Sequence, residues 1–370
     1  MLAALLSCTT TGVLSHAQEP TPPTASRSAI TAASGEEIYR AACVTCHGPD
    51  GRGAPRTTVG FETLLPDFTD CGFATAEADA DWMAVVHEGG RIRGLSRMMP
   101  AFGDALTKEQ IAAAVGHVRS FCPDRAWPRG DLNFPRAMFT EKAFPENEVV
   151  FTNTITRGTA PSVSNELVYE RRFGARNQIE AVIPVDSAKS EFGWQTGLGD
   201  VALAFRRTVY ANIRSGSIAA AGGEVIFPTG DEVRGLGNGY HVFEPFAMFG
   251  QAFPRNSFLQ VHGGLEIPSD NAKGTREAYL RTALGFTHMS DRGFGRSWSP
   301  QVEVLWARPF GDRPEWDLVP QLQVSLSKIQ HVVVAAGVRV PLNARGDRGP
   351  SVVTYLLWDW FDGPFTSFWR

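Results

Sequence analysis

Long apolar runs are missing from this sequence. Beyond the first residues, no stretch of 18 or more apolar residues occurs in the 370-residue chain, so we expect no transmembrane helix. The missing apolar run does not exclude a membrane β-barrel, because each strand of a barrel carries a much weaker apolar signal than a transmembrane helix does. A basic excess is also missing, since the net charge is -4, and this argues against a nucleic-acid partner. A chain of this length predicts two domains.

The N-terminus lacks the basic residues that usually open an export signal, but residues 1–17 otherwise fit one. Leu2–Leu6 is apolar, and Ser15-His16-Ala17 offers small residues for cleavage. A second interpretation is a lipoprotein signal in which Cys8 becomes the lipidated residue. Residues 18–33 are rich in Pro, Thr, Ser and Ala, which predicts a flexible linker.

The sequence contains one C-x-x-C-H motif, Cys43-Val44-Thr45-Cys46-His47. Two thiols one helical turn apart can both reach the vinyl groups of one porphyrin, and the following His can ligate the iron. A chance motif, or a redox or zinc C-x-x-C pair, is the alternative. The context favours haem, because a capping box at Ser34 opens a helix before the motif and a glycine-rich loop, 48–53, follows it. We therefore predict one covalent haem c, bound to Cys43 and Cys46 with His47 as axial ligand.

The second axial ligand is expected in a loop tens of residues further on. Met99 in Met98-Met99-Pro100-Ala101-Phe102-Gly103 is the best candidate, since Pro100 keeps this segment out of a helix and a thioether ligand raises the potential. Met98 and His87 are alternatives. A methionine here could also simply pack in the core.

Two helices and a disulfide are predicted around this loop. Thr107 to Gln110 forms a second capping box, which opens a helix with Ile111, Val115, Val118 and Cys122 on one face. A middle helix is expected over 78–87. Cys71 and Cys122 are expected to pair in an oxidising compartment. Three acidic residues in this region, Glu77, Asp79 and Asp81, are interpreted as a solvated face or as a docking surface for a basic partner.

Residues 35–122 resemble a class I c-type cytochrome of bacterial type. The matching segments are Ile38-Tyr39, the C-x-x-C-H motif, the Gly-Pro-Asp-Gly-Arg-Gly loop and Met-Pro-Ala-Phe-Gly. The resemblance implies a mostly helical fold and a low-spin haem ligated by His47 and Met99. We accordingly expect an all-α cytochrome c domain over 34–125 and a linker over 126–145.

From residue 146 to 370 the pattern changes to strands. Segments of strand length recur between turn residues, and we expect roughly twelve of them. The predicted strands are 148–157, 162–173, 177–185, 198–210, 217–228, 239–252, 256–268, 277–288, 297–309, 315–328, 331–343 and 350–361. Several alternate between apolar and polar positions, as in Leu318–Leu326. An antiparallel outer-membrane β-barrel fits this pattern, and a soluble β-sandwich is the alternative.

The predicted connections alternate in length. Those near 175, 254 and 329 are short, whereas 186–197, 228–239, 269–276 and 344–349 are long and polar. Short periplasmic turns and long outer loops are typical of outer-membrane barrels, so the cytochrome is expected on the short-turn side. The segment 290–296 is an exception, being long where a short turn is expected. Glu266 and Glu303 are interpreted as pore-lining or structural carboxylates.

The segment Gly197–Leu203, with Phe227–Asp231 in support, resembles a motif of small outer-membrane transporter-like barrels that are linked to the degradation of aromatic compounds. The domain order resembles that of cytochrome–porin fusions. The resemblance implies an outer-membrane protein with its cytochrome in the periplasm.

No nucleophile, base or carboxylate pair indicates catalysis, and we expect an electron carrier. Its expected partners are periplasmic redox proteins and outer-membrane lipid, with a small solute in the barrel as a further candidate. Two alternatives are a solute channel whose cytochrome serves a periplasmic oxidoreductase, and a porin-fused extracellular iron oxidase. A barrel of about twelve strands is too narrow to enclose a cytochrome domain, which weakens the second alternative.

Overall fold

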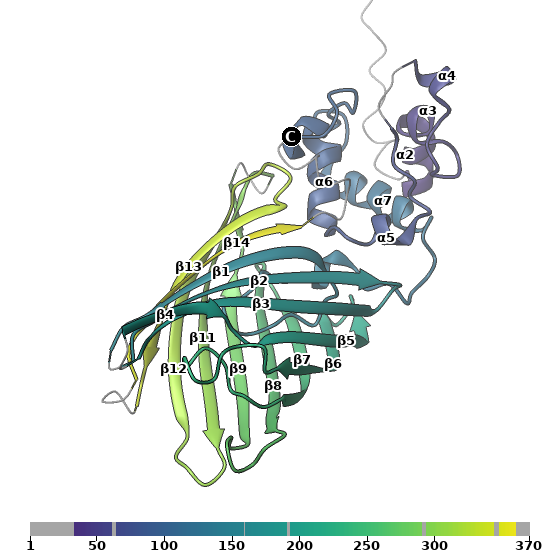
Figure 1. The fold of residues 1–370 in the computed structure, drawn as a ribbon. Helices are drawn as coiled ribbons and strands as arrows, with labels where there is room; N and C mark the ends of the chain where they lie inside the picture. Colours follow the sequence, from purple (N-terminus) through teal and green to yellow (C-terminus); the bar gives the residue numbers. More distant parts are fainter. Residues whose placement is uncertain are drawn as a thin grey trace, which may run out of the picture.

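The structure is a computed structural model, and it describes residues 33–60, 64–158, 160–190, 193–290, 294–343 and 348–359. The predicted export or lipoprotein signal and the N-terminal linker, apart from Ala33, lie outside these residues. Helices come first in the chain and strands follow, and the helices gather at one end of the barrel that the strands form (Figure 1). None of the described helices has the length and hydrophobicity that a membrane span requires.

The helices of the N-terminal region are short. They are α2 (Gly35–Ala42), α3 (Val44–His47), α4 (Arg56–Val59), α5 (Cys71–Ala74), α6 (Asp79–Glu88), η1 (Gly90–Arg93), α7 (Lys108–Arg119) and η2 (Gly130–Leu132). Both predicted capping boxes are present, at Ser34 and Thr107. Helix α2 packs across α7, and Gly35 permits this crossing because the carbonyl of Ala113 occupies the space of a side chain.

Fourteen strands are found in the described residues. They are β1 (Asn147–Thr156), β2 (Ser162–Phe173), β3 (Asn177–Ser190), β4 (Gly193–Leu198), β5 (Val201–Asn212), β6 (Ser217–Phe227), β7 (Val242–Phe253), β8 (Ser257–Pro268), β9 (Glu277–Phe286), β10 (His288–Met289), β11 (Ser297–Pro309), β12 (Glu315–Ser325), β13 (Val332–Pro341) and β14 (Ser351–Asp359). All pair antiparallel, and the ring closes because β14 pairs with β1 and β9 pairs with β11.

The ring has twelve strand positions, because β4 and β5 share one position and β9 and β10 share another. The predicted number of strands is therefore confirmed. One predicted loop is wrong: residues 186–190 and 193–197 pair with each other as a hairpin extension of β3 and β4. Backbone pairing there needs no apolar alternation, so the polar sequence looked like a loop.

The outer face of the barrel is apolar along nearly every strand. Its exposed large side chains include Phe151, Leu167, Ile183, Leu203, Phe249, Leu284, Val302, Leu322, Val338 and Leu356. The inward positions between them carry buried polar groups such as Gln260, Glu303 and Gln323. Apolar residues outside and polar residues inside are what a membrane-spanning barrel requires, and a soluble sandwich would show the reverse.

The predicted linker over 126–145 connects the two domains, and its second half lies inside the barrel. Phe134 and Phe144 pack against inward residues of β6, β7 and β8, and Phe134 stacks on Phe258 with ring centroids 5.6 Å apart. Glu303 of β11 accepts hydrogen bonds from the backbone N–H groups of Met138 (2.8 Å) and Thr140 (2.7 Å). We call residues 132–146 the lumen segment.

The lumen segment also carries charge into the barrel. Arg136 pairs with Glu148 of β1 (2.8 Å) and Glu170 of β2 (2.5 Å), and its carbonyl accepts from Tyr355 of β14 (2.8 Å). Lys142 pairs with Glu146 and Glu148. Contacts with strands around the ring place this segment in the lumen, and each of its own charged side chains has an oppositely charged partner.

The cytochrome region sits at the short-turn end of the barrel, as predicted (Figure 1). Arg176, in the turn between β2 and β3, donates to the Ala126 carbonyl (2.8 Å). The described end of the connection that broke the predicted pattern contacts the cytochrome, because Arg93 donates to the carbonyls of Phe294 and Gly295.

Candidate haem site

The C-x-x-C-H motif begins where α2 ends. Cys43 caps α3, and the His47 N–H donates to the Cys43 carbonyl (2.9 Å), so the motif forms one helical turn. Both thiols are free and half-buried. Burial raises the pKa of the Cys43 thiol to about 11 and lowers the pKa of His47. A neutral imidazole beside two thiols is the donor set that haem c attachment needs.

The glycine-rich loop after the motif fixes the position of His47. The N–H groups of Gly53 and Ala54 donate to the carbonyls of His47 (2.9 Å) and Cys46 (2.7 Å), and Gly53 has a φ of 81° that glycine adopts without strain. The His47 ring stacks on Phe68, with centroids 5.0 Å apart. Its Nδ1 is buried and has no hydrogen-bond partner within the described residues.

Met99 is held by two backbone hydrogen bonds in the loop that follows η1. Its N–H donates to the Ser96 carbonyl (3.3 Å), and its carbonyl accepts from Gly90 (3.1 Å). Met98 and Met99 both line the cavity that contains the C-x-x-C-H motif. Met98 is 56% exposed whereas Met99 is half-buried, which favours Met99 as the inward-facing thioether.

The cavity has a volume of about 670 Å³ and is mostly apolar. Its lining combines Cys43, Cys46 and His47 with Leu65, Phe68, Phe73, Trp82, Val85, Val86, Met98, Met99, Phe102, Leu106, Val115 and Val118. An apolar cavity with a few convergent donors is the usual form of a cofactor site. The two thiols and the buried imidazole therefore fit a covalently attached haem.

His87 is engaged elsewhere. Its ring stacks on Phe294 of the barrel, with centroids 4.6 Å apart, and its Nδ1 lies 2.8 Å from the Glu88 carboxylate. It is not among the described residues that line the cavity. The structure thus brings Met98 and Met99, but not His87, to the motif.

The three acidic residues predicted as a solvated face form ion pairs instead. Asp79 pairs with Arg119 (3.0 Å) and with Arg129, and Asp81 pairs with Arg93 (2.7 Å). Glu77 lies 3.0 Å from His331 of the barrel. These partners are distant in sequence, so a local charge pattern could not identify them.

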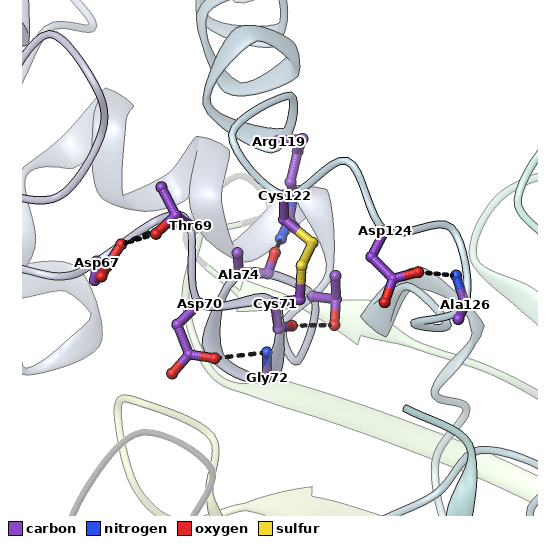
Figure 2. The surroundings of a disulfide bond; sticks show 11 residues. Asp67, Thr69, Asp70, Cys71, Gly72, Ala74, Arg119, Cys122, Asp124 and Ala126 are labelled. Carbon is purple, nitrogen blue, oxygen red and sulfur yellow. Dashed lines mark hydrogen bonds between the residues drawn. A yellow bond between two sulfur atoms is a disulfide. The ribbon is translucent and has the colours of Figure 1, made fainter. Parts of the chain in front are cut away.

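Cys71 and Cys122 form the expected disulfide, which joins the start of α5 to the segment after α7 (Figure 2). Their Cα atoms are 5.2 Å apart. Beside the bond, Arg119 donates to the Ala74 carbonyl, and the Asp70 carboxylate accepts from the Gly72 N–H (2.9 Å). The disulfide therefore fixes α5 against α7 behind the cavity.

Arg93 and Ile329 are among the cavity residues that sequence reasoning missed. Arg93 is buried at the cavity wall, and Ile329 reaches the cavity from the barrel connection between β12 and β13. Ile329 gives no local sequence signal, because it is part of a different domain. The barrel thus completes the wall of the cytochrome cavity.

Comparisons with known proteins agree with the N-terminal assignment. Residues 31–118 match the family described as cytochrome c oxidase, cbb3-type, subunit III. Among curated proteins, none matches the chain.

Several solved porin and channel structures are similar to the barrel in part. The KdgM porin has a TM-score of 0.40 at 7% identity, over 58% of this chain and 99% of the porin. The NanC porin has a TM-score of 0.41 at 8% identity, over 57% of this chain and 99% of the porin. An outer membrane channel from Pseudomonas putida F1 has a TM-score of 0.42 at 14% identity, over 61% of this chain and 99% of the channel. The barrel assignment rests on the strand pairing itself.

A c-type cytochrome domain and a closed 12-strand antiparallel barrel are thus joined in one chain. This is the architecture of a cytochrome–porin fusion, and the cytochrome family implies a haem c.

Proposed function

We propose that this protein is an electron carrier anchored in the outer membrane, with one haem c bound covalently to Cys43 and Cys46 and ligated by His47 and Met99. The observation that carries the proposal is the apolar cavity of about 670 Å³ that brings the C-x-x-C-H motif and the Met98–Met99 loop together. When bound, the haem supplies one-electron redox chemistry.

The protein's own residues set the conditions for that chemistry. Phe68, Phe73 and Trp82 line the cavity and exclude water, and the Met99 thioether favours a high potential. Arg93 and Asp81 add a buried ion pair at the cavity wall. This arrangement supports electron transfer rather than substrate chemistry, because His47 and Met99 would both hold the haem and leave its iron no site for a substrate.

The filled lumen supports an anchor rather than a solute channel. Residues 132–146 contact inward side chains of strands around the ring, so an open pore requires that segment to move. The cytochrome at the short-turn end supports exchange with periplasmic redox proteins. An extracellular iron oxidase has less support, since the haem cavity lies at the end opposite the long loops.

The test is the visible spectrum of the purified full-length protein and of two matched variants, Met99→Ala and Met98→Ala. We expect haem that stays on the chain in a denaturing gel, and a low-spin spectrum with the weak near-infrared methionine–iron band. That band should disappear in Met99→Ala and persist in Met98→Ala. A high-spin wild type, or loss of the band only in Met98→Ala, would overturn the ligand assignment, and haem lost on denaturation would overturn the covalent link.

A further inference from the structure

A basic pocket lies where the cytochrome meets the rim of the barrel. It has a volume of about 470 Å³. Its lining residues are Arg91, Gly94, Leu95 and Arg97 from the cytochrome and Arg296, Leu326, Ser327 and Lys328 from the barrel. We call it the rim pocket. Four cationic side chains from both domains therefore share one small space.

Among the described residues, the four cations of the rim pocket have no counter-ions. Arg91, Arg97, Arg296 and Lys328 are all exposed, and within the part of the chain that the structure describes none of their side chains forms an ion pair or hydrogen bond. Like charges gathered in one pocket repel one another. Such an arrangement is favourable when an anion binds between them, and guanidinium groups bind phosphate in a bidentate manner.

The pocket also lies at the end of the lipid-facing wall. Trp298 of β11 is 47% exposed and Leu326, just beyond β12, is 43% exposed, and both continue the outward apolar rows of these strands. Arg296 lies two residues before Trp298 and Lys328 lies two residues after Leu326, each on the side of the barrel rim. Aromatic residues with basic residues beyond them mark the level of the lipid headgroups.

We propose that the rim pocket binds the headgroup of an anionic phospholipid from the surrounding leaflet. Its phosphate is held by Arg91, Arg97, Arg296 and Lys328, and its acyl chains lie along the apolar outer face of β11 and β12. Basic pockets of this kind at membrane level suit anionic lipid headgroups. An acidic protein partner would use the charges but would leave the adjoining apolar wall unexplained.

The bound lipid would tie the cytochrome to the barrel. Arg97 follows Ser96, whose carbonyl accepts the Met99 N–H (3.3 Å), and Leu95 lines both the rim pocket and the haem cavity. A phosphate that bridges Arg97 and Lys328 therefore joins the Met99 loop to the barrel turn. The proposed lipid site in the rim pocket does not depend on which residues ligate the haem iron.

The experiment measures lipid binding to the purified full-length protein by native mass spectrometry. The probes are phosphatidylglycerol and phosphatidylcholine with identical acyl chains, and inorganic phosphate. The test variant is Arg97→Gln/Lys328→Gln. The matched control is Arg214→Gln/Arg255→Gln, which removes two exposed arginines from other turns of the same end. We expect phosphatidylglycerol to bind the test variant roughly 25-fold more weakly, about fivefold for each charge, and the control to stay within about twofold of wild type.

The comparison of phosphatidylglycerol with phosphatidylcholine on the wild-type protein needs no variant, and it shows whether the pocket selects an anionic headgroup. Equal binding of both lipids overturns the proposal, as does equal loss in the test and control variants. Inorganic phosphate that displaces the lipid at the same concentration would show a site for free anions instead. If the test variant changes only the salt-dependent binding of an acidic redox protein, the pocket is a protein-docking site and the lipid proposal is wrong.

Discussion

At the scale of single residues, Asp81 links the haem cavity to the barrel interface. It lines the cavity, and its carboxylate accepts hydrogen bonds from Arg93 Nε (3.1 Å) and Nη2 (2.7 Å). Burial raises the pKa of Asp81 to about 6, the Glu77 carboxylate adds to the rise, and Arg93 and His331 oppose it. Because the folded protein binds this proton more tightly than the unfolded chain, stability from this group falls as pH rises from about 4 through about 6.

We therefore predict a pH-dependent haem potential. Deprotonation of Asp81 places a negative charge at the cavity wall, which favours the oxidised haem, so the potential should fall as pH rises through about 6. The expected change is on the order of tens of millivolts, the size of a partly screened charge–charge interaction. Spectroelectrochemical titration between about pH 5 and about pH 7 measures it, and Asp81→Asn should flatten this dependence.

Asp67→Asn is the matched control for this titration. Asp67 also lines the cavity, but hydrogen bonds from the Thr69 hydroxyl (2.6 Å) and N–H (2.8 Å) hold the pKa of Asp67 below its ordinary value. It stays ionised across the range, so its removal should raise the potential at every pH without changing the slope. An unchanged slope in Asp81→Asn would contradict the assignment.

At the scale of elements, local signals predicted most of the fold. The capping boxes at Ser34 and Thr107 and the alternation in Leu318–Leu326 are read within a few residues, so helix α7 and strand β12 were predictable. The lumen segment was not, because its burial depends on strands far along the chain. Its Phe134 and Phe144 give no periodic pattern, and only the closed ring places them inside. The same holds for Ile329 at the haem cavity.

The lumen segment depends strongly on one acceptor. Glu303 accepts from the N–H groups of Met138, Phe139 and Thr140, from the Thr140 hydroxyl and from Gln321. We predict that Glu303→Ala loosens this segment, because each buried N–H left without a partner costs about 1–3 kcal/mol. In planar bilayers the wild type should show no stable pore, whereas Glu303→Ala should show intermittent conductance.

Glu266→Ala is the control for the conductance experiment. Glu266 is only half-buried, and no hydrogen bond joins it to the lumen segment among the described residues. The Glu266→Ala substitution should therefore leave the barrel closed to ions. Steady conductance in the wild type would show that the segment does not seal the lumen and would favour the solute-channel alternative.

At the scale of the whole molecule, the two domains meet through a small set of specific contacts. Phe294 stacks on His87, and the Phe294 carbonyl accepts from Arg93. His331 lies between Glu77 (3.0 Å) and Asp359 of β14 (3.3 Å). These contacts orient the haem cavity toward the barrel rim, where Ile329 closes it. The barrel is therefore part of the cytochrome's environment as well as its anchor.

This coupling predicts separate unfolding of the two domains, with the cytochrome stabilised by the barrel. Phe294→Ala removes a ring stack worth about 1 kcal/mol but keeps the carbonyl that Arg93 uses, so the cytochrome should melt roughly 4–8 °C lower. The haem-region circular dichroism follows this transition, and the heat-dependent gel mobility of the barrel should not change. Phe310→Ala removes a ring that is 55% exposed from the opposite end of the barrel, away from the cytochrome, and should alter neither signal. A decrease of the same size in the melting temperature of the cytochrome in both variants would mean that the interface does not stabilise the cytochrome. The orientation of the haem cavity would then need another cause.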